Sequence, residues 1–389
     1  MTDDKLTKDR GGYDRFLLLA VLLLLGIGLV MVYSASSVVA AKRFGSDTYF
    51  FERQAAYALA AILLLICCRY VPYTFYMTMA YPLLGAALVL LVVLYVPGIG
   101  HEVGGAKRWL RFFGVSFQPS EFARLALIVY LAYSMTKKRE KIKEFSIGFL
   151  PHAILFVCFT TMIVLQPDFG MAVIIALIVW TMLFLGGVRL CYLLPVLAAM
   201  APIAYYVLIH AGYRLNRLAS FLDPWQHQSD AGYQVVHSLM AFGSGGIFGA
   251  GIGNGYQKLF YLPEPHTDFI FSVIGEELGL VGVCFVTGLY VIILWRGIVI
   301  AMRARDLFAT FLAAGLTISL GLQVCINQAV ALGLLPTKGL TLPFASYGGT
   351  SLVVNAVAVG ILMNISARQP VLHEKYFNVA RKTAEPLLT

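Results

Sequence analysis

The chain has 389 residues, of which 59% are hydrophobic and only 13% are charged, and its formal net charge is +9. Soluble domains carry about a quarter charged residues, so this composition excludes a soluble globular protein and predicts an all-α polytopic membrane protein. The positive charge calls for no nucleic-acid partner, because membrane topology and attraction to acidic lipids account for it.

Apolar runs of membrane-spanning length recur from one end of the sequence to the other. They predict about ten transmembrane helices in a single membrane domain, residues 1–389. The first run follows basic residues as a signal peptide would, but it is as long as a full span and no clean cleavage site follows, so we expect it to be retained. In chain order the predicted spans lie near residues 16–34, 54–70, 77–96, 121–136, 147–165, 169–187, 190–210, 269–295, 307–333 and 347–366.

Basic residues gather on one side of the predicted membrane when the N-terminus is placed in the cytoplasm. The segment 1–15, the run "KKREKIKEF" at 137–145, the run "RGIVIAMRARD" at 296–306 and the tail 367–389 then share that side. This is the positive-inside asymmetry, so both termini are predicted to be cytoplasmic.

The cysteine and histidine patterns predict no structural cross-links. All six cysteines lie within or at the edges of predicted spans, which indicates packing roles rather than disulfides. The histidines are scattered, with no H-E-x-x-H motif or Cys/His cluster, so a zinc site is not expected.

Two longer connections face the opposite, outer side. Residues 97–120 join spans three and four, and residues 211–268 form a large loop between spans seven and eight whose aromatics, glycines and charges indicate function. The spacing of Gly245, Gly249 and Gly253 predicts a compact re-entrant or interfacial element that approaches a neighbouring helix closely, with a flexible hinge as the alternative. Residues 335–351 form a Gly/Pro-interrupted segment of the kind that lines cavities.

Asp268 is the first candidate for chemistry, at the outer mouth of span eight. It has two interpretations: an N-cap of the following helix, or a general base. Glu264 and His266 favour the second, because neighbouring charges and partial desolvation can raise the pKa of a carboxyl group toward that of a base. Pro263 and Pro265 stiffen this approach to the helix.

Further acids are predicted within or at the ends of helices. Glu276 and Glu277, two turns into span eight, are expected to be paired inside the bundle. Glu121 and Arg124 are three residues apart and form either a buried structural pair or a place where Arg124 receives an anionic ligand. Asp168 lies in the link "LQPDFG" at the same outer level as Glu121 and Asp268, and together these acids predict a polar cavity that opens outward.

Cations also occur on the outer side, where topology alone would deplete them. A phosphate-bearing ligand would explain their presence, because Arg and Lys are the usual phosphate partners. Trp109 and Phe112 nearby fit either an interfacial aromatic belt or stacking on a sugar ring. The outer cations are Lys107, Arg108, Arg111, Arg214, Arg217, Lys258 and Lys338.

The sequence resembles the SEDS (shape, elongation, division and sporulation) family over nearly the whole chain. The resemblance rests on "SLMAFGSGGIFGAGIGNGYQKLFYLPEPHTDFIFSVIGEELG" together with "GAKRW", "QPSE", "QPDFG", "FLDPW" and "LPTKGLTLPFASYGGTS". Lys338 in "PTKGL" is similar to the division branch of that family rather than the elongation branch. Thr350 stands where the family usually has serine, which keeps the hydroxyl.

The resemblance implies a peptidoglycan glycosyltransferase, of the hexosyltransferase class, that polymerises lipid II at the outer face of the bacterial inner membrane during septal cell-wall synthesis. It implies a complex with a class B penicillin-binding transpeptidase, alongside other divisome membrane proteins and the undecaprenyl-linked glycan strand. The family's essential aspartate matches Asp268. Its "RW" pair and cavity acids match Arg108, Trp109, Glu121 and Asp168, and Ser346 in "SYGGT" joins the expected substrate-binding residues.

We therefore expect Asp268 to act as the base on the 4-hydroxyl of the acceptor GlcNAc. Five cations, with or without a divalent ion such as Mg or Mn for which Asp268 is a possible ligand, would face the diphosphate. A lipid II flippase, an elongation polymerase and a structural scaffold are the alternatives. The five expected cations are Lys107, Arg108, Arg214, Lys258 and Lys338.

Overall fold

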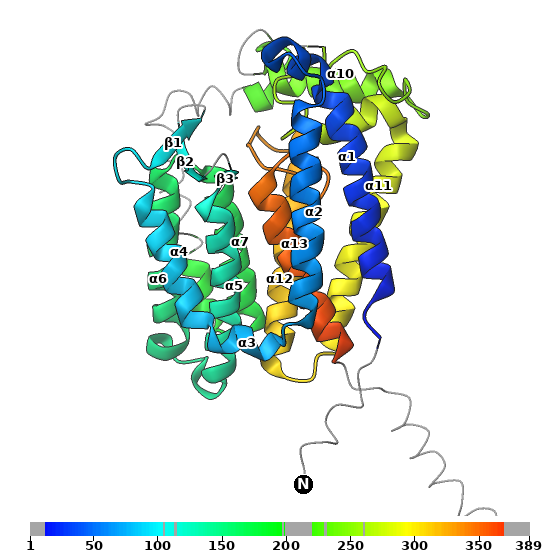
Figure 1. Cartoon of the computed structure of the whole chain (residues 1–389). Coiled ribbons are helices and arrows are strands. Elements are labelled where there is room, and N and C mark those ends of the chain that lie inside the picture. The colour runs from blue at the N-terminus through cyan, green and yellow to red at the C-terminus, as the bar shows by residue number, and fades with distance from the viewer. Residues whose placement is uncertain are drawn as a thin grey trace, which may run out of the picture.

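The computed structural model describes residues 12–103, 106–112, 115–196, 198, 220–228, 232–259 and 261–368. Its helices lie side by side in one bundle, with a small sheet and the short helix α10 at one end (Figure 1). The helices are α1 (Arg15–Phe44), α2 (Tyr49–Tyr70), α3 (Tyr73–Thr78), α4 (Ala80–Val93), α5 (Pro119–Lys137), α6 (Leu150–Leu165), α7 (Phe169–Leu185), α10 (Tyr233–Gly245), α11 (Ile270–Met302), α12 (Leu307–Ala331) and α13 (Gly349–Ala367).

The helical bundle bears out the predicted fold class. Within the described part of the chain, six segments are long and apolar enough to cross a membrane: α1, α2, Phe145–Leu165, α11, α12 and α13. The shorter apolar helices α4 and α7 and the 19-residue α5 occupy three further predicted spans. The predicted span 190–210 lies largely outside the described residues.

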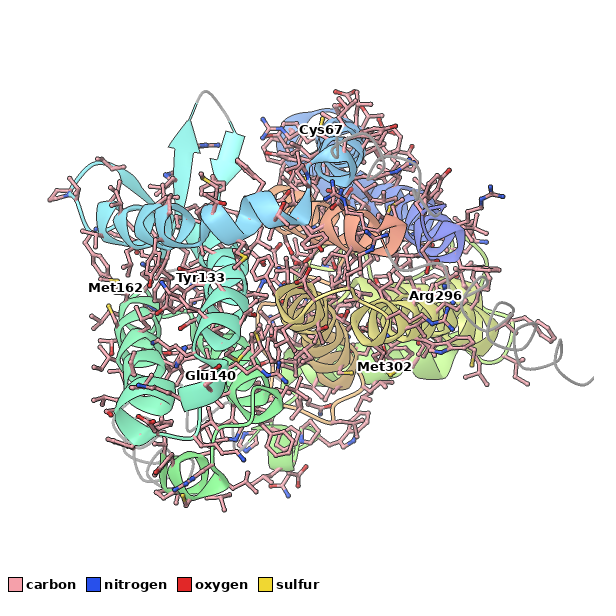
Figure 2. The ribbon with its side chains drawn as sticks, turned by 90° about the horizontal axis from the view of Figure 1, so that it is seen from below. Cys67, Tyr133, Glu140, Met162, Arg296 and Met302 are labelled. Atoms are coloured by element: carbon pink, nitrogen blue, oxygen red, sulfur yellow. The ribbon has the colours of Figure 1, made fainter. Side chains whose placement is uncertain are left out.

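Seen along the bundle, the helices form two groups (Figure 2). Tyr133 of α5 and Met162 of α6 mark one group, and Cys67 of α2 and Arg296 of α11 mark the other. Helix α12 contacts α5 and α7 on one side and α11 and α13 on the other, so it joins the groups. Among the six segments of membrane-spanning length, α13 is the most enclosed, with 83% of its most apolar 18-residue stretch buried.

Two of the differences from the sequence prediction are in α1 and in residues 97–120. Helix α1 continues to Phe44, ten residues beyond the predicted end, and stops at Gly45, whose φ of 74° is left-handed. Residues 97–120 contain an antiparallel sheet in the order β1–β2–β3, built from β1 (Gly100–Val103), β2 (Ala106–Phe112) and β3 (Val115–Phe117). Strands this short, with weak alternation, give little sequence signal.

The two ends of the bundle are fixed by contacts between helix termini. At one end Asp14 precedes α1, and its carboxylate accepts from Arg296 Nε of α11 at 2.6 Å while its backbone N–H donates to Ser366 Oγ of α13 at 3.2 Å. The three helices therefore start or finish together there. The sheet, the α6–α7 link and the approach to α11 lie at the opposite end, which we call the Asp268 end.

Helix α11 is broken near the Asp268 end, at Gly279 (φ 64°, ψ −165°). The loop after α10 fills the break: the N–H groups of Ala250 and Gly251 donate to the carbonyls of Glu276 and Glu277 at 2.9 and 3.0 Å. In return, the N–H groups of 280 and 281 donate to the carbonyls of 246 and 247. Every exchanged bond satisfies a backbone group that the break had freed.

Glycine is required where this loop and α11 meet. A Cβ at Gly245 would lie 2.0 Å from the carbonyl oxygen of Gly275, and one at Gly249 would lie 2.2 Å from that of Glu277. The predicted close approach through the glycine spacing is therefore confirmed at these two positions. At Gly253 a Cβ would meet nothing within 4 Å.

Candidate active site

Asp268 lies at the end of the bundle to which it gives its name, two residues before α11. The N-cap residue of α11 is Phe269, which makes no side-chain cap bond, so Asp268 is not the N-cap that one interpretation expected. Its side chain is neither fully buried nor fully exposed. A carboxylate in this position can meet a ligand from outside the bundle while it stays next to a helix N-terminus.

The backbone of Asp268 is held by an amide from α12. Asn327 Nδ2 donates to the carbonyl of Asp268 at 2.9 Å and to the carbonyl of Leu340 at 2.6 Å. A Cβ at Gly339 would lie 3.1 Å from Asp268 Oδ2, so the carboxylate lies against the segment 337–340. Lys338 is the neighbouring residue in that segment, and partial burial lowers the pKa of its ammonium group.

His266 connects the approach to α11 with α2 and the segment before α13. Its ring lies 4.5 Å from the ring of Phe50 and 5.7 Å from that of Tyr347, and its carbonyl accepts from the N–H of Tyr347 at 2.9 Å. Burial lowers the pKa of the imidazole, although the nearby Glu264 carboxylate opposes that shift. His266 is therefore a packed, neutral neighbour of Asp268.

Glu264 is exposed and adopts a left-handed backbone conformation, with φ of 50°. Such a conformation is strained for a residue with a side chain. Its carbonyl accepts from both the N–H and the hydroxyl of Thr267 at 3.2 Å, and one carboxylate oxygen lies 3.9 Å from His266 Nε2. The two flanking prolines thus belong to a tight turn that leads directly into Asp268.

Ser346 was expected among the substrate-binding residues, and the structure places its hydroxyl inside the chain. The side chain is 3% exposed, and its oxygen accepts from the N–H of Leu342 at 2.8 Å. Gln54 of α2 donates to its carbonyl at 3.1 Å. These contacts fix the turn before α13, and in our account Ser346 has this structural role.

Asp168 is the N-cap of α7 and forms a second polar cluster at the same end. It accepts from the N–H of Met171 at 3.3 Å, from Gln118 Nε2 at 3.1 Å and from Ser120 Oγ at 3.4 Å. Burial raises the pKa of this carboxyl group, and the positive charge of Arg108 opposes the shift. Arg108 itself donates from β2 to the carbonyls of 166 and 167 at the end of α6.

Glu121 and Arg124 form a third, fully buried cluster. They pair at 2.8 Å on α5, as the structural alternative for this motif expects. Arg124 also donates to Ser319 of α12 at 2.6 Å and to Asn355 of α13 at 2.9 Å. The guanidinium is therefore occupied by three helices rather than held open for a ligand.

The three acids share one end of the bundle, but they are linked through α13 rather than by direct contact. Asn355 Nδ2 donates to Ser351 Oγ at 3.3 Å, and Ser351 Oγ is 3.0 Å from Thr341 Oγ1. Thr341 follows Leu340, whose carbonyl accepts from Asn327. Thr350 accepts from the backbone N–H of Gln118 at 3.1 Å. The start of α13 therefore lies between the clusters.

Lys258 was expected to face a diphosphate, and the structure places it in a buried ion pair. Its ammonium lies 2.6 Å from Glu277 and 2.9 Å from Ser34 Oγ, and both charged side chains are almost inaccessible. Glu276 accepts from the backbone N–H groups of 256 and 257. The prediction of pairing inside the bundle is confirmed for Glu277, whose partner is Lys258, whereas the Glu276 carboxylate is held by backbone N–H groups.

The remaining predicted cations occupy different places. Lys107 and Arg111 are exposed on β2, and Trp109 lies between them, partly buried and paired in register with His101. Arg214 lies outside the described residues. Among the described residues, the candidate cations that remain near Asp268 and Asp168 are Lys338 and Arg108.

A divalent ion, if bound, would find few protein ligands here. Within the part of the chain that the structure describes, no group of three or more His, Cys, Asp or Glu side chains has a metal-holding arrangement. Mg²⁺ can be held by one carboxylate, substrate phosphates and water, so Asp268 alone fits such an ion.

Two residues that position the site were not among the predicted ones. Asn327 holds Asp268, and Gln54 holds the turn before α13. The exposed fraction of each residue is 2% or less. A signal was present in the sequence, because an amide inside an apolar run is costly unless it bonds to something. The sequence alone does not tell which backbone it meets.

Comparison with known proteins places this site in a family. Residues 15–370 match the model of the "cell cycle protein" family that comprises FtsW, RodA and SpoVE. The chain is 47% identical over 355 residues to the probable peptidoglycan glycosyltransferase FtsW of Trichlorobacter lovleyi, covering 91% of this chain and 93% of that protein. It is 42% identical over 357 residues to the protein of the same name from Coxiella burnetii, covering 91% and 96%.

Solved structures have the same fold. A chain from a structure titled "Structural coordination of polymerization and crosslinking by a peptidoglycan synthase complex" matches with a TM-score of 0.77 at 29% identity, covering 92% of this chain and 99% of that one. The crystal structure of the rod shape determining protein RodA from Thermus thermophilus matches with a TM-score of 0.68 at 30% identity, covering 92% and 97%.

Proposed function

The chain belongs to the FtsW/RodA/SpoVE family of cell cycle proteins, and on that premise we propose that it is a peptidoglycan glycosyltransferase that polymerises lipid II into glycan strands. The family expected from the sequence motifs is thereby confirmed. The protein is a multi-pass membrane protein of the bacterial inner membrane, and the names of its relatives favour the division branch over the elongation branch. Its septal location, cytoplasmic termini and outward-facing Asp268 end are parts of the proposal.

The observation that carries the proposed chemistry is the position of Asp268. Its carboxylate lies against Gly339, its backbone is held by Asn327, and its side chain is partly accessible. A base that works on a sugar hydroxyl must be held in place and still be reachable. Among the three acids, Asp168 and Glu121 are both enclosed, so Asp268 is the one that can meet a substrate.

In the proposed reaction, the Asp268 carboxylate takes the proton from the 4-hydroxyl of the acceptor GlcNAc. The hydroxyl oxygen forms a bond to the anomeric carbon of the donor sugar, and the bond from that carbon to the diphosphate oxygen breaks. The diphosphate departs with the electron pair, and Lys338 and Arg108 are placed at the same end to stabilise its charge. We assign Lys258 no part in this step, because Glu277 and Ser34 hold its ammonium against α1.

The proposed partner is a class B penicillin-binding transpeptidase of the same membrane, which would cross-link the strands that this chain makes. Other divisome membrane proteins would recruit the pair to the septum. The similarity to a chain of a peptidoglycan synthase complex supports the first of these partners.

Reconstitution separates this proposal from a lipid II flippase. Vesicles that contain the protein, its transpeptidase partner and fluorescent lipid II are expected to form glycan polymer that a gel resolves. Asp268→Asn should abolish the polymer, whereas Glu102→Gln, an exposed acid on β1 at the same end, should leave it unchanged. Movement of labelled lipid between leaflets with no polymer from the unaltered protein would contradict the proposal.

A further inference from the structure

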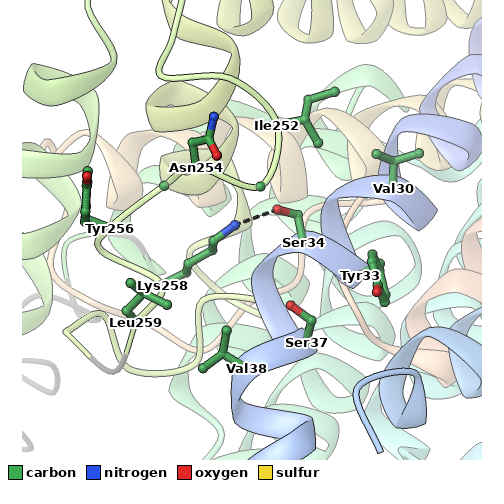
Figure 3. A pocket seen from close by; sticks show the side chains of 12 residues that line it. Val30, Tyr33, Ser34, Ser37, Val38, Ile252, Asn254, Tyr256, Lys258 and Leu259 are labelled. Carbon is green, nitrogen blue, oxygen red and sulfur yellow. Dashed lines mark hydrogen bonds between the residues drawn. The ribbon is translucent and has the colours of Figure 1, made fainter.

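A cavity of about 530 Å³ lies between α1 and the loop 252–259, apart from the Asp268 surface. Its α1 wall comes from residues 30–38, with Val30, Ser34, Ser37 and Val38 on one helix face at spacings of three, four, seven and eight. The opposite wall is the loop that carries Asn254 (Figure 3). The volume falls in the range of ligand pockets, roughly 300–1,000 Å³.

The depth of the cavity in the membrane is set by α1. At about 1.5 Å per residue, Val30 lies about 22 Å and Val38 about 34 Å along the helix from Arg15, which starts it at the other end. The hydrocarbon core of a bilayer is about 30 Å thick, so the cavity lies at the interface of one leaflet, the leaflet at the Asp268 end. It is at the level of lipid head groups.

The rim of the cavity is apolar and exposed. The exposed fractions of the side chains are 48% for Val30, 38% for Val38 and 58% for Ile252. By the depths given above, Val30 lies within the hydrocarbon and meets acyl chains, whereas Val38 lies at the level of the head groups. A ligand that enters between them from the bilayer is therefore an amphiphile.

The interior of the cavity is polar and carries a positive group. Lys258 reaches from the loop toward α1, where it donates to Ser34 at 2.9 Å and pairs with Glu277 at 2.6 Å (Figure 3). An ammonium has three donors, and these contacts use two of them. Ser37 adds a hydroxyl to the same face of α1.

A negative group, Asp47, lies one side chain beyond the lining of the cavity. Tyr33 lines it, and Tyr33 Oη donates to Asp47 Oδ2 at 2.9 Å. The Lys258–Glu277 pair is neutral as a unit, so a strongly anionic head would gain little net attraction and would be repelled by Asp47. A lipid head group that carries both a phosphate and an ammonium matches the two sides of the cavity, with the phosphate toward Lys258 and the ammonium toward Asp47.

We propose that this cavity binds the head group of one zwitterionic aminophospholipid, of the phosphatidylethanolamine type, from the leaflet at the Asp268 end. Its acyl chains run along the exposed face of α1 beside Val30 and Val38. The bound lipid would brace α1 against the loop that fills the break in α11.

Lipid retention by the purified full chain tests this proposal. Delipidated protein is titrated separately with phosphatidylethanolamine, phosphatidylglycerol and undecaprenyl phosphate, and bound lipid is counted by native mass spectrometry. We expect one tightly bound phosphatidylethanolamine per chain and weaker binding of the two anionic lipids. Equal retention of all three would overturn the proposal, and preferred binding of undecaprenyl phosphate would assign the cavity to a prenyl lipid instead.

Matched variants locate the bound lipid. Val30→Trp should fill the cavity and weaken phosphatidylethanolamine binding about tenfold, or about 1.4 kcal/mol. Leu23→Trp, which is 40% exposed on the same helix but outside the cavity, should bind as the unaltered protein does. Equal binding by the two variants would contradict the assignment.

Two further variants guard against misfolding and test the charge match. If Val30→Trp fails to fold, Ser37→Leu fills the cavity with a smaller side chain and should also weaken phosphatidylethanolamine binding. Asp47→Asn should remove the preference for phosphatidylethanolamine over phosphatidylglycerol while a lipid still binds. An unchanged preference would refute the charge match. No lipid II is present in these measurements, so their outcome is independent of the proposed polymerase activity.

Discussion

Asn327 of α12 holds Asp268 in place: its side-chain amide donates to the backbone carbonyl of Asp268 at 2.9 Å and, with its other N–H, to that of Leu340 at 2.6 Å. One buried amide thus joins Asp268 to the segment that carries Lys338. The two segments are far apart in the sequence, and their relative position decides the geometry of the site.

We predict that Asn327→Leu slows polymerisation more than it weakens lipid II binding, because the side chain positions the carboxylate without touching substrate. Loss of the amide would remove a donor from both carbonyls, at a cost in stability of about 1–3 kcal/mol. Gln328→Leu is the matched control, since the side-chain amide of this neighbouring residue donates to Thr287 Oγ1 of α11 at 3.2 Å and not to the Asp268 segment among the described residues. A fall in kcat in the Asn327 variant with KM unchanged is expected; equal effects from both variants would count against a positioning role.

The Glu121–Arg124 pair is predicted to be a structural element. Arg124→Met leaves a carboxylate buried without its partner and should destabilise the protein by about 3–5 kcal/mol, whereas replacing both partners together should cost less. Thermal unfolding in detergent measures both. If Arg124→Met melts like the unaltered protein yet loses lipid II binding, the pair is a ligand site instead.

The break in α11 supplies a third prediction. Gly279→Ala places a Cβ 2.3 Å from the backbone nitrogen of Gly249, at a left-handed φ, and should destabilise the interlocked loop strongly. Gly288→Ala, in the same helix with nothing within 4 Å of its Cβ, should be neutral or stabilise the helix by up to about 1 kcal/mol. The two melting temperatures should move in opposite directions or differ widely; similar values would mean that the break is not a fixed feature.

His266 predicts a dependence of stability on pH. Burial holds its pKa below the ordinary 6.5, so below pH 6.5 the unfolded chain binds a proton that the folded protein resists. Stability contributed by the neutral ring is present above pH 6.5 and declines as the pH falls below it toward the folded-state pKa. His266→Phe should weaken this decline relative to the unaltered protein. Parallel curves of melting temperature against pH would show that His266 does not contribute.

Much of the architecture was accessible from the sequence, because hydrophobic runs of membrane length and specific motifs are local signals. The shared end of Glu121, Asp168 and Asp268 follows from the alternation of spans across a membrane. The pairing of Glu121 with Arg124 follows from their spacing on one helix.

The partner of Lys258 could not be predicted from the sequence in the same way. Its contact with Glu277 depends on the break at Gly279 and on how the loop folds back into it, and neither leaves a periodic pattern. The predicted first span also ended too early, at residue 34. The structure places Ser34 within α1, where its hydroxyl donates to Glu277 at 2.7 Å inside the bundle. The strands β1–β3 depend on pairings between short segments, which local patterns do not encode.

The most direct test of the account is the rate of glycan polymer formation by Asp268→Asn at saturating lipid II, with the transpeptidase partner present and lipid II affinity measured on the same preparation. Replacing the carboxylate by an amide removes the proposed general base and keeps the shape of the side chain. The rate of polymer formation is therefore predicted to fall by about 10²–10⁴-fold while lipid II still binds. A rate within about twofold of the unaltered enzyme, well inside the effect expected of a general base, would contradict the central claim.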